Sequence, residues 1–132
     1  MKKAFFISLL TLFMVSGVCQ KAAAQEKTKY YVAIAWLYNN NDYQEKRPCV
    51  SNVVKLTCRY QITNAVSNQF HDFFNAFVKN RRGYNISPGG ITVFRYDTYD
   101  EAEKQRRKWI ADYNNSDWDT LLVHDFSVLC DD

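Results

Sequence analysis

Apolar side chains alternate along residues 29–38, but here both alternating sets are apolar. One set comprises Tyr30, Val32, Ile34, Trp36 and Tyr38, and the other Tyr31, Ala33, Ala35 and Leu37. A strand that is apolar on both faces is typical of the centre of a sheet, so residues 29–38 predict a central strand. Residues 49–61 alternate in the ordinary way. Their apolar set is Val54, Leu56, Cys58 and Tyr60, which predicts a second strand with one polar face.

A helical repeat replaces the alternation in residues 64–80. The apolar positions recur three or four residues apart, at Val66, Phe70, Phe73, Phe74, Phe77 and Val78. This spacing predicts a helix with one buried stripe, and it places Asp72 on the opposite, solvent-facing side. Thr63 or Asn64 can cap its start, and Gly83 can end it.

The next segment predicts a strand followed by a capped helix. Residues 91–96 form the strand, and Thr98 and Glu101 then have the spacing of a capping box. The helix that they begin runs to about residue 113, with an inward face of Ala102, Trp109, Ile110 and Tyr113. Residues 120–129 predict a last strand. Its two faces would be Leu121, Val123 and Leu129, and Leu122, Phe126 and Val128.

Three polar segments, residues 39–48, 84–90 and 114–119, are predicted as loops. The first is rich in Asn and Asp, and the second contains Pro88, Gly89 and Gly90, residue types that favour turns. Each loop carries an isolated aromatic ring, respectively Tyr43, Tyr84 and Trp118. Exposed rings on polar loops can stack against a ligand, so these three are the candidate ligand-binding residues.

The order of predicted elements is β-β-α-β-α-β in one α+β domain. Strands interleaved with helices favour a four-stranded mixed sheet with both helices on one face. The nearest shape class is a split β-α-β, ferredoxin-like variant that starts with a hairpin. Helical crossovers join parallel strands, so the second, third and fourth strands should point the same way.

The first 24 residues have the pattern of an export signal. Lys2 and Lys3 precede an uncharged apolar run over residues 4–18, and Ala22-Ala23-Ala24 offers a cleavage site. The apolar run is too short for a spanning helix, and no second run follows. We therefore expect residues 25–132 to be an exported periplasmic or secreted domain. Cys19 raises the alternative of a lipoprotein, which Val18 immediately before it disfavours.

Removal of this leader changes the charge balance. Lys2, Lys3 and Lys21 would leave with it, so 14 of the 17 basic residues remain against 14 acidic residues. A neutral chain does not favour nucleic acid as a partner, because that surface is met by clustered excess Lys and Arg.

Three cysteines would remain in the exported chain. Cys49 and Cys58 lie nine positions apart on one predicted strand, about 30 Å at the rise of an extended chain, too far to pair. Cys130 follows the last strand, at the same edge of the sheet as Cys58, so a Cys58–Cys130 disulfide is predicted and Cys49 is the odd cysteine. The wide spacing of the cysteines, His71 and His124 does not favour a metal site.

No nucleophile elbow, phosphate-binding glycine loop or metalloprotease motif occurs, and no cofactor is expected. These features favour a small non-enzymatic binding or interaction module for a protein, peptide or glycan, and a homodimer is left open. The alternative is a thiol enzyme or hydrolase that uses Cys58 or Cys49 with His71 or His124.

Overall fold

The computed structural model describes residues 27–39, 42–58 and 64–129. The elements follow the chain as β1 (Lys27–Asn39), β2 (Asp42–Val50), β3 (Val54–Cys58), α1 (Asn64–Phe77), the π-helical turn η1 (Val78–Arg82), β4 (Asn85–Tyr96), α2 (Tyr99–Asn115) and β5 (Leu121–Leu122). The predicted α+β class is confirmed, with one mixed sheet and two helices. Neither helix of this described part has the length and hydropathy required to span a bilayer.

β1 is the central strand of the sheet, as its doubly apolar sequence predicted. β3 pairs with its first residues and β2 with its last, so β2 and β3 follow one another along one side of β1. β4 pairs with residues from Tyr30 to Tyr38, and it therefore takes the other side. β5 lies beyond β2. The hydrophobic residues Val32, Ala33, Ala35 and Leu37 of β1 are completely buried.

The strand directions agree with the prediction from the crossovers. β2, β3 and β4 are each antiparallel to β1, and β5 is parallel to β2, so all four point the same way. β3 and β4 are joined through α1 and have β1 between them, which is a split β-α-β arrangement.

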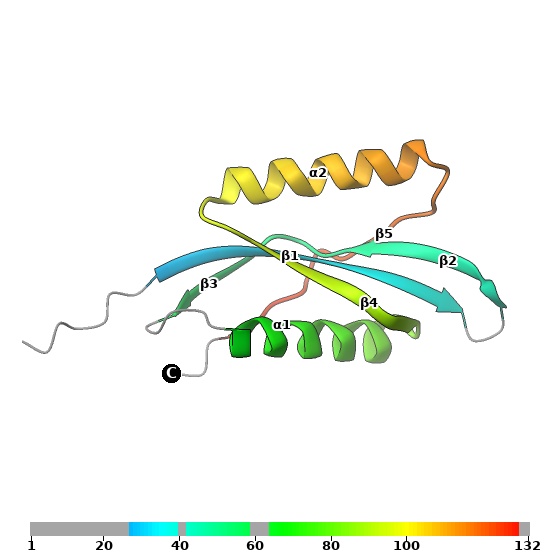
Figure 1. Cartoon of the computed structure of the whole chain (residues 1–132), viewed down its shortest axis with the longest axis horizontal. Coiled ribbons are helices and arrows are strands. Elements are labelled where there is room, and N and C mark those ends of the chain that lie inside the picture. Colours follow the sequence, from blue (N-terminus) through cyan, green and yellow to red (C-terminus); the bar gives the residue numbers. More distant parts are fainter. Residues whose placement is uncertain (1–26, 40–41, 59–63, 130–132) are drawn as a thin grey trace, which may run out of the picture.

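The prediction that both helices cover one face is wrong. α1 and α2 lie on opposite faces of the sheet (Figure 1), with separate core clusters around Phe74 and Ala102. The connection through α1 crosses β1 in one direction, and the connection through α2 crosses back over β1 and β2. Crossovers are right-handed, so two that run in opposite directions place their helices on opposite faces. Because both faces are covered, β1 is apolar on both sides.

The interior of α1 follows the predicted stripe, with one exception. Phe70, Phe74 and Val78 are fully buried. Phe73 was predicted to be buried with them, and this is wrong, because 47% of it is exposed. The buried row has four-residue spacing, and Phe73 belongs to the neighbouring row with Phe77, which packs against Phe126 at the side of the cluster. The side chain of Val66 lies outside the described set.

Two segments predicted as loops form strands instead. Residues 42–50 pair with β1 as β2, although they are rich in polar side chains. β5 accompanies β2 only at Cys49 and Val50, so the charged stretch before them is an edge, where charge discourages further pairing. Residues 85–90 belong to β4, whose register with β1 shifts opposite Trp36. Gly89 has φ +67° there, and Pro88 is tolerated because an edge strand does not need every amide.

The last predicted strand is shorter than expected. Only Leu121 and Leu122 pair with β2, and Val123 and Phe126 then bury their side chains in the same cluster below the sheet. Their prediction on opposite faces is therefore wrong. The cause is the interruption between β2 and β3 at residues 51–53. There the side-chain amide of Asn52 bonds the backbone of Phe126, in place of a neighbouring strand. Its Nδ2 donates to the Phe126 carbonyl at 2.9 Å, and its Oδ1 accepts from the Phe126 amide at 3.0 Å.

The same interruption connects the three layers of the molecule. Ser51 is fully buried, and its Oγ accepts from the Ala33 amide at 2.8 Å and donates to the Asn52 carbonyl at 2.8 Å. Above the sheet, Arg106 of α2 donates from Nε to the Ser51 carbonyl at 2.7 Å. Arg106 therefore spans the layer with a mostly covered side chain, while its neighbour Arg107 is exposed and pairs with Glu103.

Candidate functional site

The sheet has one end where β1 ends, β2 and β4 begin, and α2 terminates above them (Figure 1). We call this the hairpin end and define it by its side chains Trp36, Arg47, Tyr84, Tyr113, Trp118 and Asp119. Two of the three predicted ligand-binding residues, Tyr84 and Trp118, lie here. The backbone of the third, Tyr43, lies in β2, but its side chain is outside the described set. The structure thus brings together segments that the sequence places far apart.

Three aromatic rings meet on the α2 side of the hairpin end. The Trp36 ring lies edge-to-face against Tyr113, at 5.6 Å between centroids, and against Trp118, at 5.2 Å. Trp36 and Tyr113 are half-buried, whereas 39% of Trp118 is exposed. Edge-to-face contacts of this kind add to the burial of the rings. The ring of Trp118 is therefore held by Trp36 and still partly exposed to solvent, as a surface for ligand stacking requires.

The turn after α2 sets the position of Trp118. Its amide donates to the Tyr113 carbonyl at 3.1 Å, and the Asp117 amide donates to the Asn114 carbonyl at 3.3 Å. This pair of bonds is a Schellman motif, and Asp117 takes its left-handed position with φ 59°. Glycine is the usual residue there, and aspartate is one of the few others that adopt this conformation. The end residues of this motif are Tyr113 and Trp118, and both of their rings contact Trp36.

Arg47 closes the other side of the hairpin end. Its Nη1 donates to the Tyr84 hydroxyl at 2.9 Å, and the guanidinium lies 5.5 Å from the centre of the Tyr84 ring. Its Nε donates to the Asp119 carbonyl at 3.1 Å, and its Nη2 is 2.7 Å from the Asp119 carboxylate. Tyr84 is thus held by Arg47 and packed on the core, so its ring is less available than was predicted. The Asp119 carboxylate is 80% exposed and can still accept from a ligand.

Several residues of this surface were not among the predicted ones. Trp36 and Tyr113 were assigned to the core, because each falls on the apolar face of its element. Arg47 and Asp119 were treated as loop residues. One signal for Trp36 was present in the sequence. It is the largest side chain of its alternating set and lies near the end of the strand, so it needs a packing partner at the margin of the sheet.

The two candidate thiols are unsuited to nucleophilic chemistry. Cys49 is a free cysteine with no exposed surface, and its burial raises the pKa to about 12 even though Arg82 and Arg47 oppose the shift. A thiol nucleophile needs a lowered pKa and access to substrate. Cys58 does not titrate because it is disulfide-bonded. No other cysteine of the described ranges is its partner, and Cys130 lies outside them, so the Cys58–Cys130 pairing stays a prediction.

Neither histidine has the surroundings of a catalytic base. His71 is partly exposed on α1, with Nδ1 3.8 Å from the carboxylate of its neighbour Asp72, and His124 is exposed after β5. In the part of the chain that the structure describes, no group of three or more His, Cys, Asp or Glu side chains could hold a metal ion.

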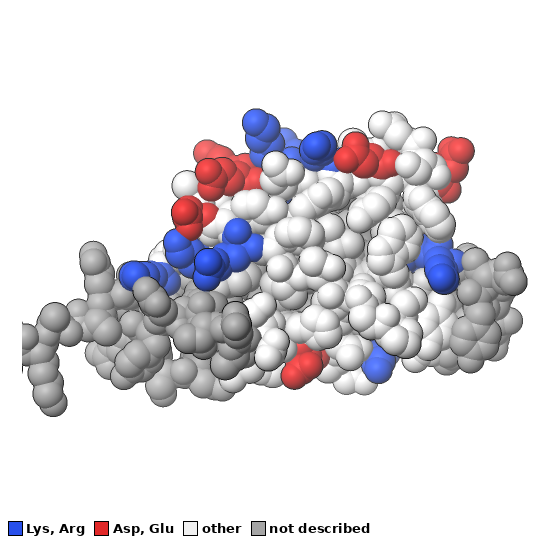
Figure 2. Space-filling model, viewed as in Figure 1, with Lys and Arg blue, Asp and Glu red and all other residues white. Residues whose placement is uncertain are grey.

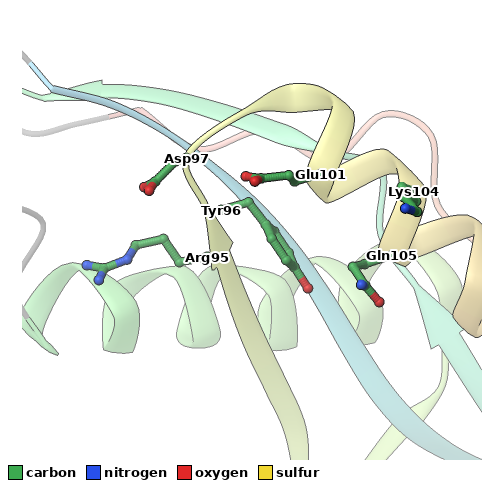
Figure 3. A pocket seen from close by; sticks show the side chains of 6 residues that line it. All are labelled: Arg95, Tyr96, Asp97, Glu101, Lys104 and Gln105. Atoms are coloured by element: carbon green, nitrogen blue, oxygen red, sulfur yellow. The ribbon is translucent and has the colours of Figure 1, made fainter.

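A concave surface lies at the opposite end of β4. It is an open pocket of about 490 Å³ between β4 and the first turns of α2 (Figure 3), lined by Arg95, Tyr96, Asp97, Glu101, Lys104 and Gln105. Asp97 forms an ion pair with Lys29, and the hydrogen bond and charge of Lys29 lower the pKa of its carboxyl group. Arg95 points away from Lys104 and Gln105. An open pocket of mixed charge with dispersed side chains has no convergent polar groups, so the hairpin end is the better candidate.

The first turn of α2 beside this pocket has an ordinary structural role. The Thr98 hydroxyl accepts from the Glu101 amide at 3.2 Å, which confirms the Thr98 half of the predicted capping box. Comparison of the chain with protein-family models, with curated proteins and with solved structures finds no match, so support for a function comes from the geometry of the hairpin end.

Proposed function

We propose that this chain is an exported, non-enzymatic binding module that takes its ligand at the hairpin end. The observation that carries this proposal is the supported, partly exposed ring of Trp118, held against Trp36 by a turn that tolerates a left-handed aspartate. Backbone strain of this kind is found preferentially at functional sites. A turn needed only to end α2 would be built more favourably with glycine at residue 117.

The chemistry of the surface favours a neutral, hydroxyl-rich ligand, and we propose a glycan. The negative face of an aromatic ring attracts the weakly positive C–H groups on one side of a sugar ring. The Asp119 carboxylate beside it can accept hydroxyl donors, and Arg47 balances its charge across a 2.7 Å contact. A strongly anionic ligand is not favoured, because the positive charge of Arg47 is already balanced by the Asp119 carboxylate.

Export is supported by the sequence of residues 1–24, and the disulfide in which the structure places Cys58 fits an exported chain. Disulfides persist in oxidising compartments and are rare in the cytosol. If the leader is removed after Ala24, Cys19 leaves with it, and because Cys49 is free we assign Cys130 as the partner of Cys58. Intact mass of the protein recovered from its bacterial envelope tests the cleavage, and non-reducing peptide mapping tests the pairing. A lipid adduct on Cys19 or a Cys49–Cys130 linkage would overturn these assignments.

The thiol-enzyme alternative is not retained, because Cys49 is buried with a raised pKa and Cys58 is oxidised. Binding of the purified protein to an array of neutral oligosaccharides tests the proposal, with a peptide array as the comparison. Trp118→Ala should abolish the binding. Tyr99→Ala is the matched control, since Tyr99 is another exposed aromatic ring, 52% exposed at the start of α2, away from the hairpin end.

Three results would overturn the assignment. One is retained binding by the Trp118→Ala protein, and another is equal loss in both variants. The third is selective binding to peptides, which would keep the site but replace the glycan.

A further inference from the structure

β4 is the edge of the sheet on its side of β1. Among the described strands it pairs with β1 alone. Its second half, from Ile91 to Tyr96, is in unbroken register with residues 30–35 of β1. The shifted segment around Gly89 precedes this half, and a turn follows it at Asp97. The regular edge is therefore six residues long.

The direction of the backbone groups along this edge follows from β1. The Ala33 carbonyl accepts from the Ser51 amide at 2.9 Å, and the Ala33 amide donates to Ser51 Oγ, so both groups of Ala33 face the β2–β3 side. Successive residues of a strand direct these groups to opposite sides. Val32 and Ile34 therefore face β4, where their partners are Phe94 and Thr92. It follows that Ile91, Val93 and Arg95 direct their amides and carbonyls outward.

Residues 91–94 of this edge lack the charged guards that edge strands commonly carry. No ionisable residue occurs between Asn85 and Phe94, and the first charge is Arg95. Figure 2 shows an uncharged surface between the two helices, on the side where β4 lies in Figure 1. The irregularity at Pro88 and Gly89 blunts the first half of β4, whereas no described strand pairs with the outer side of Ile91 to Tyr96.

We propose that two copies of this chain associate by pairing β4 with β4 in antiparallel fashion, across a two-fold axis at Val93. Val93 then pairs with its own counterpart, and Ile91 pairs with Arg95 of the other copy. All three outward-facing residues exchange amide and carbonyl hydrogen bonds in this register. The two Arg95 side chains are separated, because each lies opposite Ile91.

The register also fits the side chains on both faces. Ile91 and Val93 belong to the cluster beneath the sheet, and Phe94 belongs to the one above. Each Phe94 would lie opposite Thr92 of the other copy, in the closely spaced type of pair. The contact is isologous and its six-residue length is limited at both ends, so it closes as a dimer rather than a filament. A second copy is favoured over a foreign strand because pairing about Val93 matches the outward amide and carbonyl groups of Ile91, Val93 and Arg95 with the same groups of an identical edge.

The test is the mass of the purified full chain by sedimentation over a range of concentrations, under reducing and non-reducing conditions. The expected result is a monomer–dimer equilibrium that reducing agent does not change. Hydrogen exchange at the Ile91, Val93 and Arg95 amides should slow as the dimer forms. A monomer at all concentrations overturns the proposal. Protection of these amides in a monomer also overturns it, because another part of the chain would then cover the edge.

The variant that sharpens the test is Thr92→Lys. Thr92 is exposed, so a lysine should leave the monomer folded, but in the dimer it would lie against Phe94 of the other copy. We expect association to weaken by about tenfold or more, the equivalent of 1.4 kcal/mol. The matched control is Thr57→Lys on β3, another exposed strand threonine on the other side of β1. A dimer that Thr92→Lys leaves intact, or that both variants weaken equally, places the interface elsewhere.

Discussion

The two faces of the sheet are closed in different ways. Among the described side chains, fourteen buried residues form the cluster on the α1 face, and four form the one on the α2 face. On the α1 face, Phe70 and Phe74 of the helix and Val123 and Phe126 after β5 are buried together against the sheet. On the α2 face, Ala102 is the buried helix residue, and half-buried aromatic rings surround it. The α1 face therefore supplies most of the hydrophobic stabilisation. At the margin of the α2 face, aromatic rings remain partly exposed and can contact a ligand.

Phe74→Ala should be the most damaging change on the α1 face. Phe74 has no exposed surface and packs against Phe126 with 5.1 Å between ring centroids. Truncation removes its burial and leaves a cavity, which costs about 3–5 kcal/mol. Asp72→Ala, on the exposed side of the same helix, should stay within about 0.5 kcal/mol. Urea unfolding of the two variants checks this, and equal midpoints would show that the helix has another register.

This helix also shows how far the sequence could predict the fold. The periodicity of Phe70, Phe74 and Val78 identified the buried face, and the spacing of Thr98 and Glu101 identified the cap of α2, because both signals are local. The face that each helix covers depends on the direction of its crossover, which no local pattern contains. The sequence of β1 was the available clue. A strand with apolar side chains on both faces is expected where both faces of the sheet are covered.

The site was predicted less well for a related reason. Trp118 was found because it is an isolated ring in a polar segment. Its support by Trp36 depends on where the turn after α2 meets the end of β1, a contact between residues far apart in the chain. The polar composition of residues 42–48 concealed a strand, because an edge strand tolerates the charges that a loop also favours.

Asn52→Ala should have the next largest effect. This residue joins the interruption between β2 and β3 to Phe126, and its loss leaves the Phe126 amide and carbonyl without their side-chain partners. Each unsatisfied buried group costs about 1–3 kcal/mol, with solvent reducing the sum because the contact is part-buried. Thermal unfolding measures the loss, with exposed Asn115→Ala on α2 as the control. An equal melting temperature for both variants would show that residues 123–126 are held by their side chains alone.

The α1 face should also make stability fall at high pH. Burial raises the pKa of Cys49 to about 12, and burial also raises the pKa of Tyr31 to about 12. The unfolded chain releases both protons earlier, so the contribution of these two groups to stability is constant below about pH 8 and falls from there toward pH 12. Urea midpoints across this range check the trend, and Cys49→Ala should reduce the slope. Iodoacetamide should modify Cys49 only after unfolding, and rapid labelling of the native protein would contradict its burial.

Tyr31→Phe should have the smallest effect. The Tyr31 hydroxyl is buried in the α1 face, and no described group is its hydrogen-bond partner. A buried hydroxyl without a hydrogen-bond partner costs desolvation free energy. Its removal should therefore leave the free energy of unfolding unchanged or raise it by less than about 1 kcal/mol. A calorimetric melting temperature that drops by several degrees would reveal a partner for this hydroxyl, and the α1 face would then be less purely apolar than it is described above.

The most direct test of the contrast between the faces uses the three tryptophans as reporters. Trp36 and Trp118 lie at the hairpin end, whereas Trp109 packs on Phe94 over the middle of α2, at 4.5 Å between centroids. Each indole N–H gives its own signal in a nitrogen–proton correlation spectrum. Titration with the best oligosaccharide from the array should shift the Trp36 and Trp118 signals and leave Trp109 unchanged. A shift at Trp109 alone, or saturable binding that moves none of the three, would contradict a ligand site at the hairpin end.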